Sequence, residues 1–167
     1  PLQHITGSTS FCGHEIAVSR HVLVPRPETE QLAELGWQWL STLNAEPSTC
    51  LDFCTGSGCI AIAMAAKCPG AKVVATDISE NALALAKENA VRNQMSERIE
   101  FRQGDGFAAL LPVPLFDLIL SNPPYIPSAE IATLDPEVRD FDPRLALDGG
   151  ADGLEFCGRI AAQARTF

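Results

Sequence analysis

The chain has 167 residues, of which 12 are Lys or Arg and 21 are Asp or Glu, so its formal net charge is −9. Hydrophobic residues make up 46%, and no apolar run approaches the roughly 20 residues that cross a bilayer. The composition is typical of one folded domain and predicts no membrane partner. The surplus of carboxylates argues against stable binding to nucleic acid, because neutralising phosphates requires Lys and Arg.

Cysteine and histidine patterns exclude the common metal sites. The six cysteines form no C-x-x-C pair, and the three histidines do not combine with them at zinc-finger spacing. We therefore expect no metal, and free thiols in a reducing, cytoplasmic setting. Because the chain opens on Pro1 and closes on Phe167 directly after a helical stretch, we expect a piece of a longer protein.

The N-terminal part is rich in turn-forming residues. Two apolar stretches, at 10–18 and 21–25, predict two short strands arranged as a hairpin. Apolar residues at helical spacing then predict an amphipathic helix over 28–43. This pattern divides the chain into a β-hairpin or linker segment, 1–26, and one larger domain, 27–167.

From residue 49 onward, strand and helix patterns alternate. Strands are predicted over 49–53, 72–76, 98–103 and 115–120. Helices are predicted from 59 to 67, from 79 to about 91 and from 153 to 165. The alternation predicts an α/β fold with right-handed crossovers and an open, mostly parallel sheet that carries helices on both faces.

A glycine-containing turn lies between the first of these strands and its helix. Gly56 and Gly58 let the backbone turn tightly and let a ligand approach main-chain N–H groups at a helix N-terminus. Asp77 ends the next strand, where a carboxylate can accept both hydroxyls of an adenosine ribose. Asp105, after the third strand, is a candidate acceptor for the adenine amino group. Together these residues predict a site for an adenosine-containing cofactor.

The turn alone does not choose between two cofactors. Its spacing, Gly56-x-Gly58-x-x-Ala61, also fits the dinucleotide fingerprint, so a nicotinamide cofactor and S-adenosylmethionine both stay open. Asp52 favours the second, because a cationic sulfonium tolerates a nearby carboxylate and carries no pyrophosphate.

The tetrapeptide Asn122-Pro123-Pro124-Tyr125 follows the fourth predicted strand, at the edge of the sheet where ligands bind. An amide or aryl-amine nitrogen is a poor nucleophile, because its lone pair is delocalised. Two acceptors aimed at its N–H bonds, the Asn122 side-chain oxygen and the Pro123 carbonyl, can hold it and shift electron density onto it. Pro124 stiffens the backbone, and Tyr125 offers a flat face. The tetrapeptide predicts methylation of such a nitrogen without a metal.

These motifs resemble those of class I S-adenosylmethionine-dependent methyltransferases of the amino-methylating branch. Within that branch the chain resembles the HemK/PrmC family of release-factor glutamine methyltransferases, on the segments 1–7, 24–30, 137–140 and 143–150. The resemblance covers essentially the whole chain. It implies a Rossmann-like methyltransferase domain that is truncated after the fourth strand and the following helix, and preceded by a small hairpin.

The resemblance also implies a reaction and a set of site residues. The reaction is methyl transfer from S-adenosylmethionine to the side-chain nitrogen of the glutamine in the Gly-Gly-Gln loop of peptide chain release factors. The catalytic residues are Asn122, Pro123, Pro124 and Tyr125. The residues that line the cofactor are Asp52, Cys54, Thr55, Gly56, Ser57, Gly58, Asp77, Ile78, Asp105, Gly106 and Asn122. The residues at the substrate mouth are Arg26, Glu28 and Glu30.

Several alternatives stay open. Cys54 stands where many relatives have glycine, as it often does in ribosomal-protein glutamine methyltransferases, which are an alternative class. DNA and RNA amino-methyltransferases share the tetrapeptide, although the net charge weighs against them. An oxidoreductase with the same turn, and a module that binds cofactor without catalysis, are further alternatives. In the resembled family the strand at 115–120 pairs with a later strand, so we expect an open apolar edge here.

Overall fold

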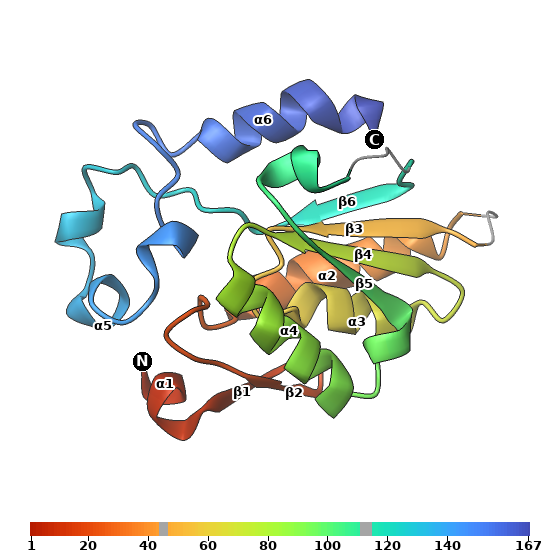
Figure 1. The fold of residues 1–167 in the computed structure, drawn as a ribbon, viewed down its shortest axis with the longest axis horizontal. Helices are drawn as coiled ribbons and strands as arrows, with labels where there is room; N and C mark the ends of the chain where they lie inside the picture. The colour runs from red at the N-terminus through yellow and green to blue at the C-terminus, as the bar shows by residue number, and fades with distance from the viewer. Residues whose placement is uncertain (44–46, 111–114) are drawn as a thin grey trace.

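The computed structural model describes residues 1–43, 47–110 and 115–167, and a four-stranded parallel sheet lies at its centre (Figure 1). The strands run in the order β5-β4-β3-β6. Their bounds are Thr49–Phe53 for β3, Lys72–Asp77 for β4, Ile99–Gln103 for β5 and Leu118–Ser121 for β6. All pairs are parallel, and their carboxyl ends meet at one edge of the sheet. The predicted parallel sheet is therefore confirmed.

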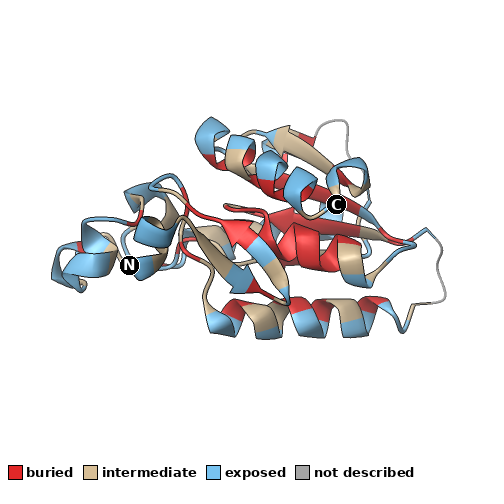
Figure 2. Cartoon of the chain, turned by 90° about the horizontal axis from the view of Figure 1, so that it is seen from below, coloured by how far each residue is buried: buried red, intermediate tan, exposed pale blue. Residues whose placement is uncertain are grey.

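Helices cover both faces of this sheet. On one face α2 (Pro27–Leu40), α3 (Cys59–Lys67) and α4 (Glu80–Arg92) pack with the hairpin around the larger apolar core. On the other face α6 (Glu155–Gln163) packs over a second cluster that includes Phe53 and Phe107. Figure 2 shows the buried residues concentrated in the sheet and α3. Because both faces are covered, the central strands are almost continuously apolar.

The hairpin differs in its bounds from the prediction. The first predicted strand, 10–18, covers the second half of β1 (Ser8–Phe11) and all of β2 (His14–Ala17), and the stretch 21–25 is not a strand. The cause is the two-residue turn at Cys12 and Gly13, which both have positive φ, 48° and 81°. Gly13 lies inside the apolar pattern that predicted one strand, and it forms the turn between two strands instead.

The N-terminal segment lies against the larger domain. A short helix, α1 (Leu2–Thr6), precedes the hairpin, and the Asn89 side chain of α4 bonds to both backbone groups of Ala17. The same amide donates to the Ser57 carbonyl at 2.9 Å, so Asn89 fastens the hairpin to the glycine turn. The division of the chain at residue 26 stays a prediction.

The loop after β6 returns to the sheet through short helical turns. It contains η3 (Ile131–Thr133), α5 (Pro136–Arg139) and η4 (Arg144–Ala146), and a bridge between Ile126 and Asp148 closes it. The remaining elements are η1 (Ser96–Arg98), η2 (Gly106–Leu110) and η5 (Ala164–Thr166). Within the described ranges no strand pairs with the outer edge of β6.

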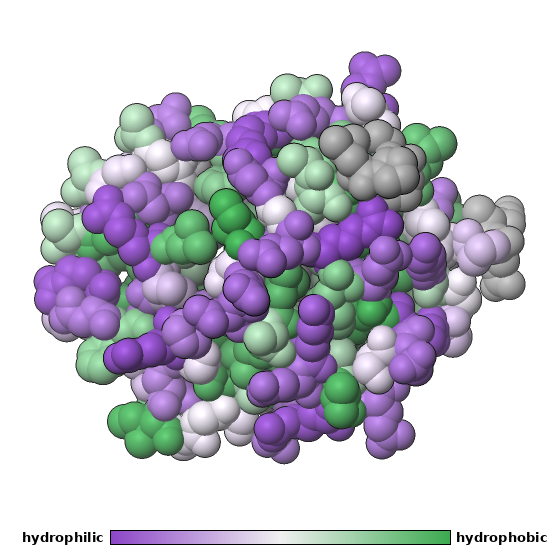
Figure 3. Space-filling model, in the orientation of Figure 1, coloured by the Kyte–Doolittle hydropathy of each residue, from purple (hydrophilic) through white to green (hydrophobic). Residues whose placement is uncertain are grey.

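On the face in Figure 3, hydrophilic and hydrophobic side chains are interspersed. None of the described helices has both the length and the hydrophobicity to cross a membrane.

Candidate active site

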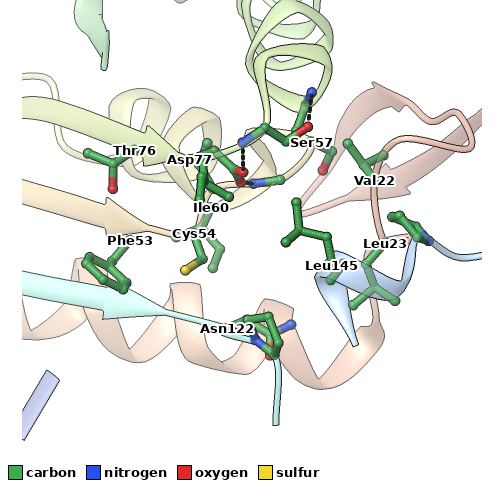
Figure 4. A pocket seen from close by; sticks show the side chains of 18 of the residues that line it. Val22, Leu23, Phe53, Cys54, Ser57, Ile60, Thr76, Asp77, Asn122 and Leu145 are labelled. Carbon is green, nitrogen blue, oxygen red and sulfur yellow. Dashed lines mark hydrogen bonds between the residues drawn. The ribbon is translucent and has the colours of Figure 1, made fainter. Parts of the chain in front are cut away.

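A pocket of about 210 Å³ opens at the carboxyl edge of β3, β4 and β6 (Figure 4). The turn after β3, the end of β4, the loop after β6 and the segment before α2 supply its walls. The predicted site residues that line it are Cys54, Thr55, Gly56, Ser57, Asp77, Ile78, Asp105, Gly106, Asn122 and Pro124. The fold therefore brings the glycine turn and part of the tetrapeptide to one cavity.

The turn after β3 depends on left-handed backbone at three residues. Cys54, Gly56 and Gly58 have φ of 64°, 54° and 81°. A Cβ at Gly58 would lie 3.0 Å from the Cβ of Ala86, whereas a Cβ at Gly56 would meet nothing within 4 Å. Gly58 therefore permits close packing of α4, and Gly56 leaves open space at the pocket wall. Cys54 holds a conformation that side chains rarely adopt, and burial raises the pKa of its thiol to about 12.

Asp77 is held by the backbone on both sides of its carboxylate. Its Oδ2 accepts from the Gly56 N–H at 2.9 Å, and its Oδ1 accepts from the Ser79 N–H at 2.9 Å. Burial raises the pKa of this carboxyl, although these N–H groups oppose the shift by stabilising the charged form. Each oxygen keeps a lone pair that can face a ligand in the pocket.

Asp52 lies behind the turn and does not line the pocket, which corrects the expectation that its side chain contacts a cofactor. Its side chain is fully buried, and its Oδ2 accepts from the Thr55 hydroxyl at 2.5 Å and the Ala61 N–H at 3.0 Å. Its Oδ1 has no partner among the described residues. Burial raises the pKa of this carboxyl to about 7. Asp52 therefore braces the turn and the start of α3.

The turn after β5 is joined to α6. Asp105 is exposed, and its Oδ1 accepts from Arg159 Nη2 at 2.7 Å. Gly106 has φ of 60°, and a Cβ there would lie 2.5 Å from the same Arg159 nitrogen. Phe156 of α6 also lines the pocket. The role of Asp105 as an adenine acceptor stays a prediction, and Arg159 is a partner that the sequence did not indicate.

Asn122, in the loop after β6, lines the pocket, and its side chain is oriented by a residue of α2. Its Nδ2 donates to the Thr29 hydroxyl oxygen at 3.2 Å, and Thr29 is itself buried beside the pocket. This bond uses one of the two N–H groups, and the Asn122 side-chain oxygen stays available as an acceptor for a ligand. One residue earlier, the Ser121 hydroxyl donates to the Phe53 carbonyl at 2.6 Å and fixes the end of β6 beside β3.

Two residues of the tetrapeptide do not line the pocket. Tyr125 is 61% exposed and does not line the pocket, so its packing against a flat acceptor group stays a prediction. Its backbone instead packs against Gly149, where a Cβ would lie 2.7 Å from the Tyr125 Cα. Pro123 is half-buried outside the lining, and only its carbonyl carries the predicted role.

None of the three residues expected at the substrate mouth lines the pocket. Arg26 donates to Asp142 Oδ2 at 2.8 Å. Glu30 Oε1 accepts from the Cys12 N–H at 2.6 Å and so stabilises the hairpin turn. Glu28 is exposed in the first turn of α2, where a carboxylate is favourable. Arg26 and Glu30 thus bind other parts of the chain, and the contact of all three residues with a substrate stays a prediction.

The wall of the pocket across from Asn122 is lined by aliphatic residues that the sequence did not single out. Val22, Leu23 and Leu145 lie across from Asn122 in Figure 4. The first two belong to the segment predicted as a strand, and Leu145 belongs to the loop after β6. An apolar pattern indicates burial in general, so it gave no signal for this wall. Among the described residues, no three His, Cys, Asp or Glu side chains cluster as metal ligands.

Comparisons with known proteins match this chain to methyltransferases, and the similar sequences cover nearly all of it. The sequence profile of the family "Methyltransferase small domain" matches residues 37–134. The release factor glutamine methyltransferase of Chlorobaculum tepidum is 45% identical over 98% of this chain and 58% of its own length. That of Geobacter sulfurreducens is 46% identical over 98% of this chain and 55% of its own length. The chain thus spans somewhat more than half the length of these curated relatives.

The fold is also found among solved structures. The N-terminal domain of human METTL16, solved in complex with SAH, matches with a TM-score of 0.62 and 19% identity. The match covers 92% of this chain and 56% of that chain. This likeness shows the Rossmann-like methyltransferase fold and no more.

Proposed function

Because the chain belongs to the methyltransferase small domain family, we propose that it acts in methyl transfer from S-adenosylmethionine to a protein glutamine. The acceptor is the side-chain amide nitrogen of the glutamine in the Gly-Gly-Gln loop of peptide chain release factors. The family match and the names of the similar proteins support this proposal. The structural observation that carries it is Asn122, held by Thr29 at the wall of the pocket.

The cofactor half of the pocket suits S-adenosylmethionine. The Asp77 carboxylate, already fixed by two N–H groups, can accept the ribose hydroxyls. Gly56 leaves open space where a side chain would otherwise stand, and Ile78 and Phe156 offer apolar surface for the adenine ring. When bound, the cofactor supplies an electrophilic methyl group on a sulfonium.

The acceptor half suits an aliphatic side chain that ends in a flat amide. Asn122 Oδ1 and the Pro123 carbonyl oxygen accept the two N–H bonds of the amide and raise the electron density on its nitrogen. Leu23 and Leu145 contact the methylene groups of the glutamine. After transfer the nitrogen releases a proton to water, so no strong base is required. The surplus of carboxylates opposes a nucleic acid acceptor, because phosphates are repelled.

Labelled S-adenosylmethionine and purified release factor test this proposal. The assay uses this chain and, in parallel, the chain extended to the full length of its relatives. The matched control is a release factor in which the Gly-Gly-Gln glutamine is replaced by alanine. We expect label in the unaltered release factor and none in the control. Transfer by neither protein, or equal label in the control, contradicts the proposal, and label only in a ribosomal protein reassigns the acceptor.

A further inference from the structure

Three segments that are far apart in the sequence meet at the carboxylate of Asp142. Its Oδ2 accepts from Arg26 Nη2 at 2.8 Å, and its Oδ1 accepts from His4 Nε2 at 2.9 Å. The Asp142 side chain has no exposed surface, and that of Arg26 is about one-third exposed. A covered carboxylate is costly unless it is paired, so these contacts are a built feature of the fold. By contrast, both side chains of the Arg139–Asp140 ion pair in the same loop are exposed to solvent.

Asp142 directly precedes the part of the loop that forms a wall of the pocket. Pro143, Leu145 and Ala146 line the cavity, and the backbone N–H of Ala146 bonds to the Pro143 carbonyl at 2.8 Å. Figure 1 shows this loop, which runs from β6 through α5, beside the N-terminal helix. The position of the wall therefore depends on what holds Asp142.

Arg26, which binds Asp142, begins the helix that carries Thr29. Arg26 is the N-cap residue of α2, and its carbonyl accepts from the N–H of Thr29 at 3.0 Å. Thr29 in turn holds the amide of Asn122. One helical turn thus anchors both the acceptor-holding Asn122 and the loop wall across the pocket.

We propose that Arg26, Asp142 and His4 form a clamp that positions the loop wall, Pro143 to Ala146, opposite Asn122. We call these three residues the Asp142 clamp, and they are positioning residues that do not touch the substrate. This inference rests on the proposed function, because the wall matters as the surface against which the acceptor amide is held. Methyl transfer requires the nitrogen, methyl carbon and sulfur in line, and a misplacement of about 1 Å costs about a hundredfold in rate.

The clamp affects one half of the pocket. The cofactor half is built from the turn after β3 and the end of β4, which are held by Asp52, Asp77 and Asn89. None of these contacts passes through Asp142. Loss of the clamp therefore lowers acceptor turnover and leaves cofactor affinity near its original value, whereas general unfolding lowers both.

The test compares Asp142→Asn and Arg26→Gln with Asp140→Asn, an exposed control in the same loop. Arg26→Gln keeps the test usable if the buried substitution prevents folding, and Arg26→Lys tests rescue of function. We measure kcat and KM for methylation of release factor, the affinity for S-adenosylhomocysteine, and hydrogen exchange of the bonded amides of residues 146–148. Kinetics use whichever of the two chain lengths is active, and the other measurements use this chain.

For Asp142→Asn and Arg26→Gln we expect kcat/KM to fall about tenfold to a hundredfold, with S-adenosylhomocysteine affinity unchanged within about twofold. In these two variants the hydrogen-exchange protection of the amides of residues 146–148 falls. Asp140→Asn matches the parent protein in every measurement, and Arg26→Lys recovers part of the activity. Parental kcat/KM in both variants, or an equal loss of cofactor affinity, overturns the clamp. If the parent protein methylates no release factor, the proposed function fails, and hydrogen exchange still decides whether the clamp holds the loop.

Discussion

The Thr29 hydroxyl oxygen and the Asn122 side-chain nitrogen lie 3.2 Å apart, although 93 positions separate these residues in the sequence. The contact joins the first turn of α2 to the loop after β6 and leaves the carbonyl end of the Asn122 amide for a ligand. It fixes an orientation that neither segment could fix alone, because an amide at the end of a strand can rotate about its side-chain bonds.

Removal of the Thr29 hydroxyl is predicted to slow methyl transfer. Thr29→Val keeps the shape of the side chain but cannot accept the hydrogen bond of Asn122, which is worth about 1 kcal/mol. We expect turnover to fall about fivefold, while S-adenosylhomocysteine affinity in calorimetry stays the same. Thr42→Val, an exposed position just beyond α2, is the control. Parental turnover in Thr29→Val would show that Asn122 needs no such partner.

The two glycines of the turn are predicted to respond differently to alanine. In Gly58→Ala the left-handed backbone costs about 1 kcal/mol, and the new Cβ also lies 3.0 Å from Ala86. In Gly56→Ala only the backbone cost applies, because the space is open. We expect Gly58→Ala to lower the free energy of unfolding by clearly more than Gly56→Ala, as measured in urea.

Besides its effect on stability, Gly56→Ala is predicted to weaken cofactor binding. Gly56 lines the pocket, and an alanine Cβ there would meet no protein atom within 4 Å, so we expect the added methyl group to compete with the cofactor for space. We expect Gly56→Ala to weaken S-adenosylhomocysteine binding about tenfold or more, since a lost close approach removes at least one backbone contact. Unchanged affinity in Gly56→Ala means that the cofactor does not approach this turn.

The buried carboxyl of Asp52 predicts a dependence of stability on pH. Its pKa in the folded protein is raised to about 7, well above the value of about 4 that an unfolded chain shows. Between about pH 4 and pH 7 the folded protein keeps a proton that the unfolded chain has lost. The contribution of Asp52 to the free energy of unfolding therefore decreases as pH rises through this range and levels off above it.

Asp52→Asn isolates this contribution. Its side-chain oxygen can still accept from Thr55 and Ala61, but the group no longer titrates. Urea unfolding at a series of pH values from 4 to 8 measures both proteins. We expect the difference between parent and variant to change steadily from about pH 4 to 7, in favour of the variant at higher pH. A constant difference over this range contradicts a raised pKa.

The regular part of the fold was predictable because each strand carries a signal of its own. β3 and β4 each have an apolar centre and are bounded by turn residues, and their predicted ends agree with the structure within one residue. The glycine turn and Asp77 were also placed correctly in space, because parallel strands bring their carboxyl ends to one edge. The hairpin was misplaced because Cys12 in a left-handed turn has no distinctive local pattern.

The rest of the site depends on contacts between distant segments. The partnership of Arg26 with Asp142 spans 116 positions, and the sequence placed Arg26 at the substrate mouth without indicating Asp142 as its partner. Asp52 was expected to face a cofactor, but a carboxylate at the end of a strand can point either way. Only the packing of α3 turns it toward the Ala61 N–H.

Replacement of Asn122 tests the central claim most directly. In Asn122→Ala the side-chain acceptor is absent, and the cofactor half of the pocket keeps its contacts. The measurement is the single-turnover rate of methyl transfer to release factor glutamine, with saturating labelled S-adenosylmethionine. The account predicts a loss of about a hundredfold or more with S-adenosylhomocysteine affinity retained. A rate equal to that of the parent protein would contradict the role of Asn122 and, with it, the assigned reaction.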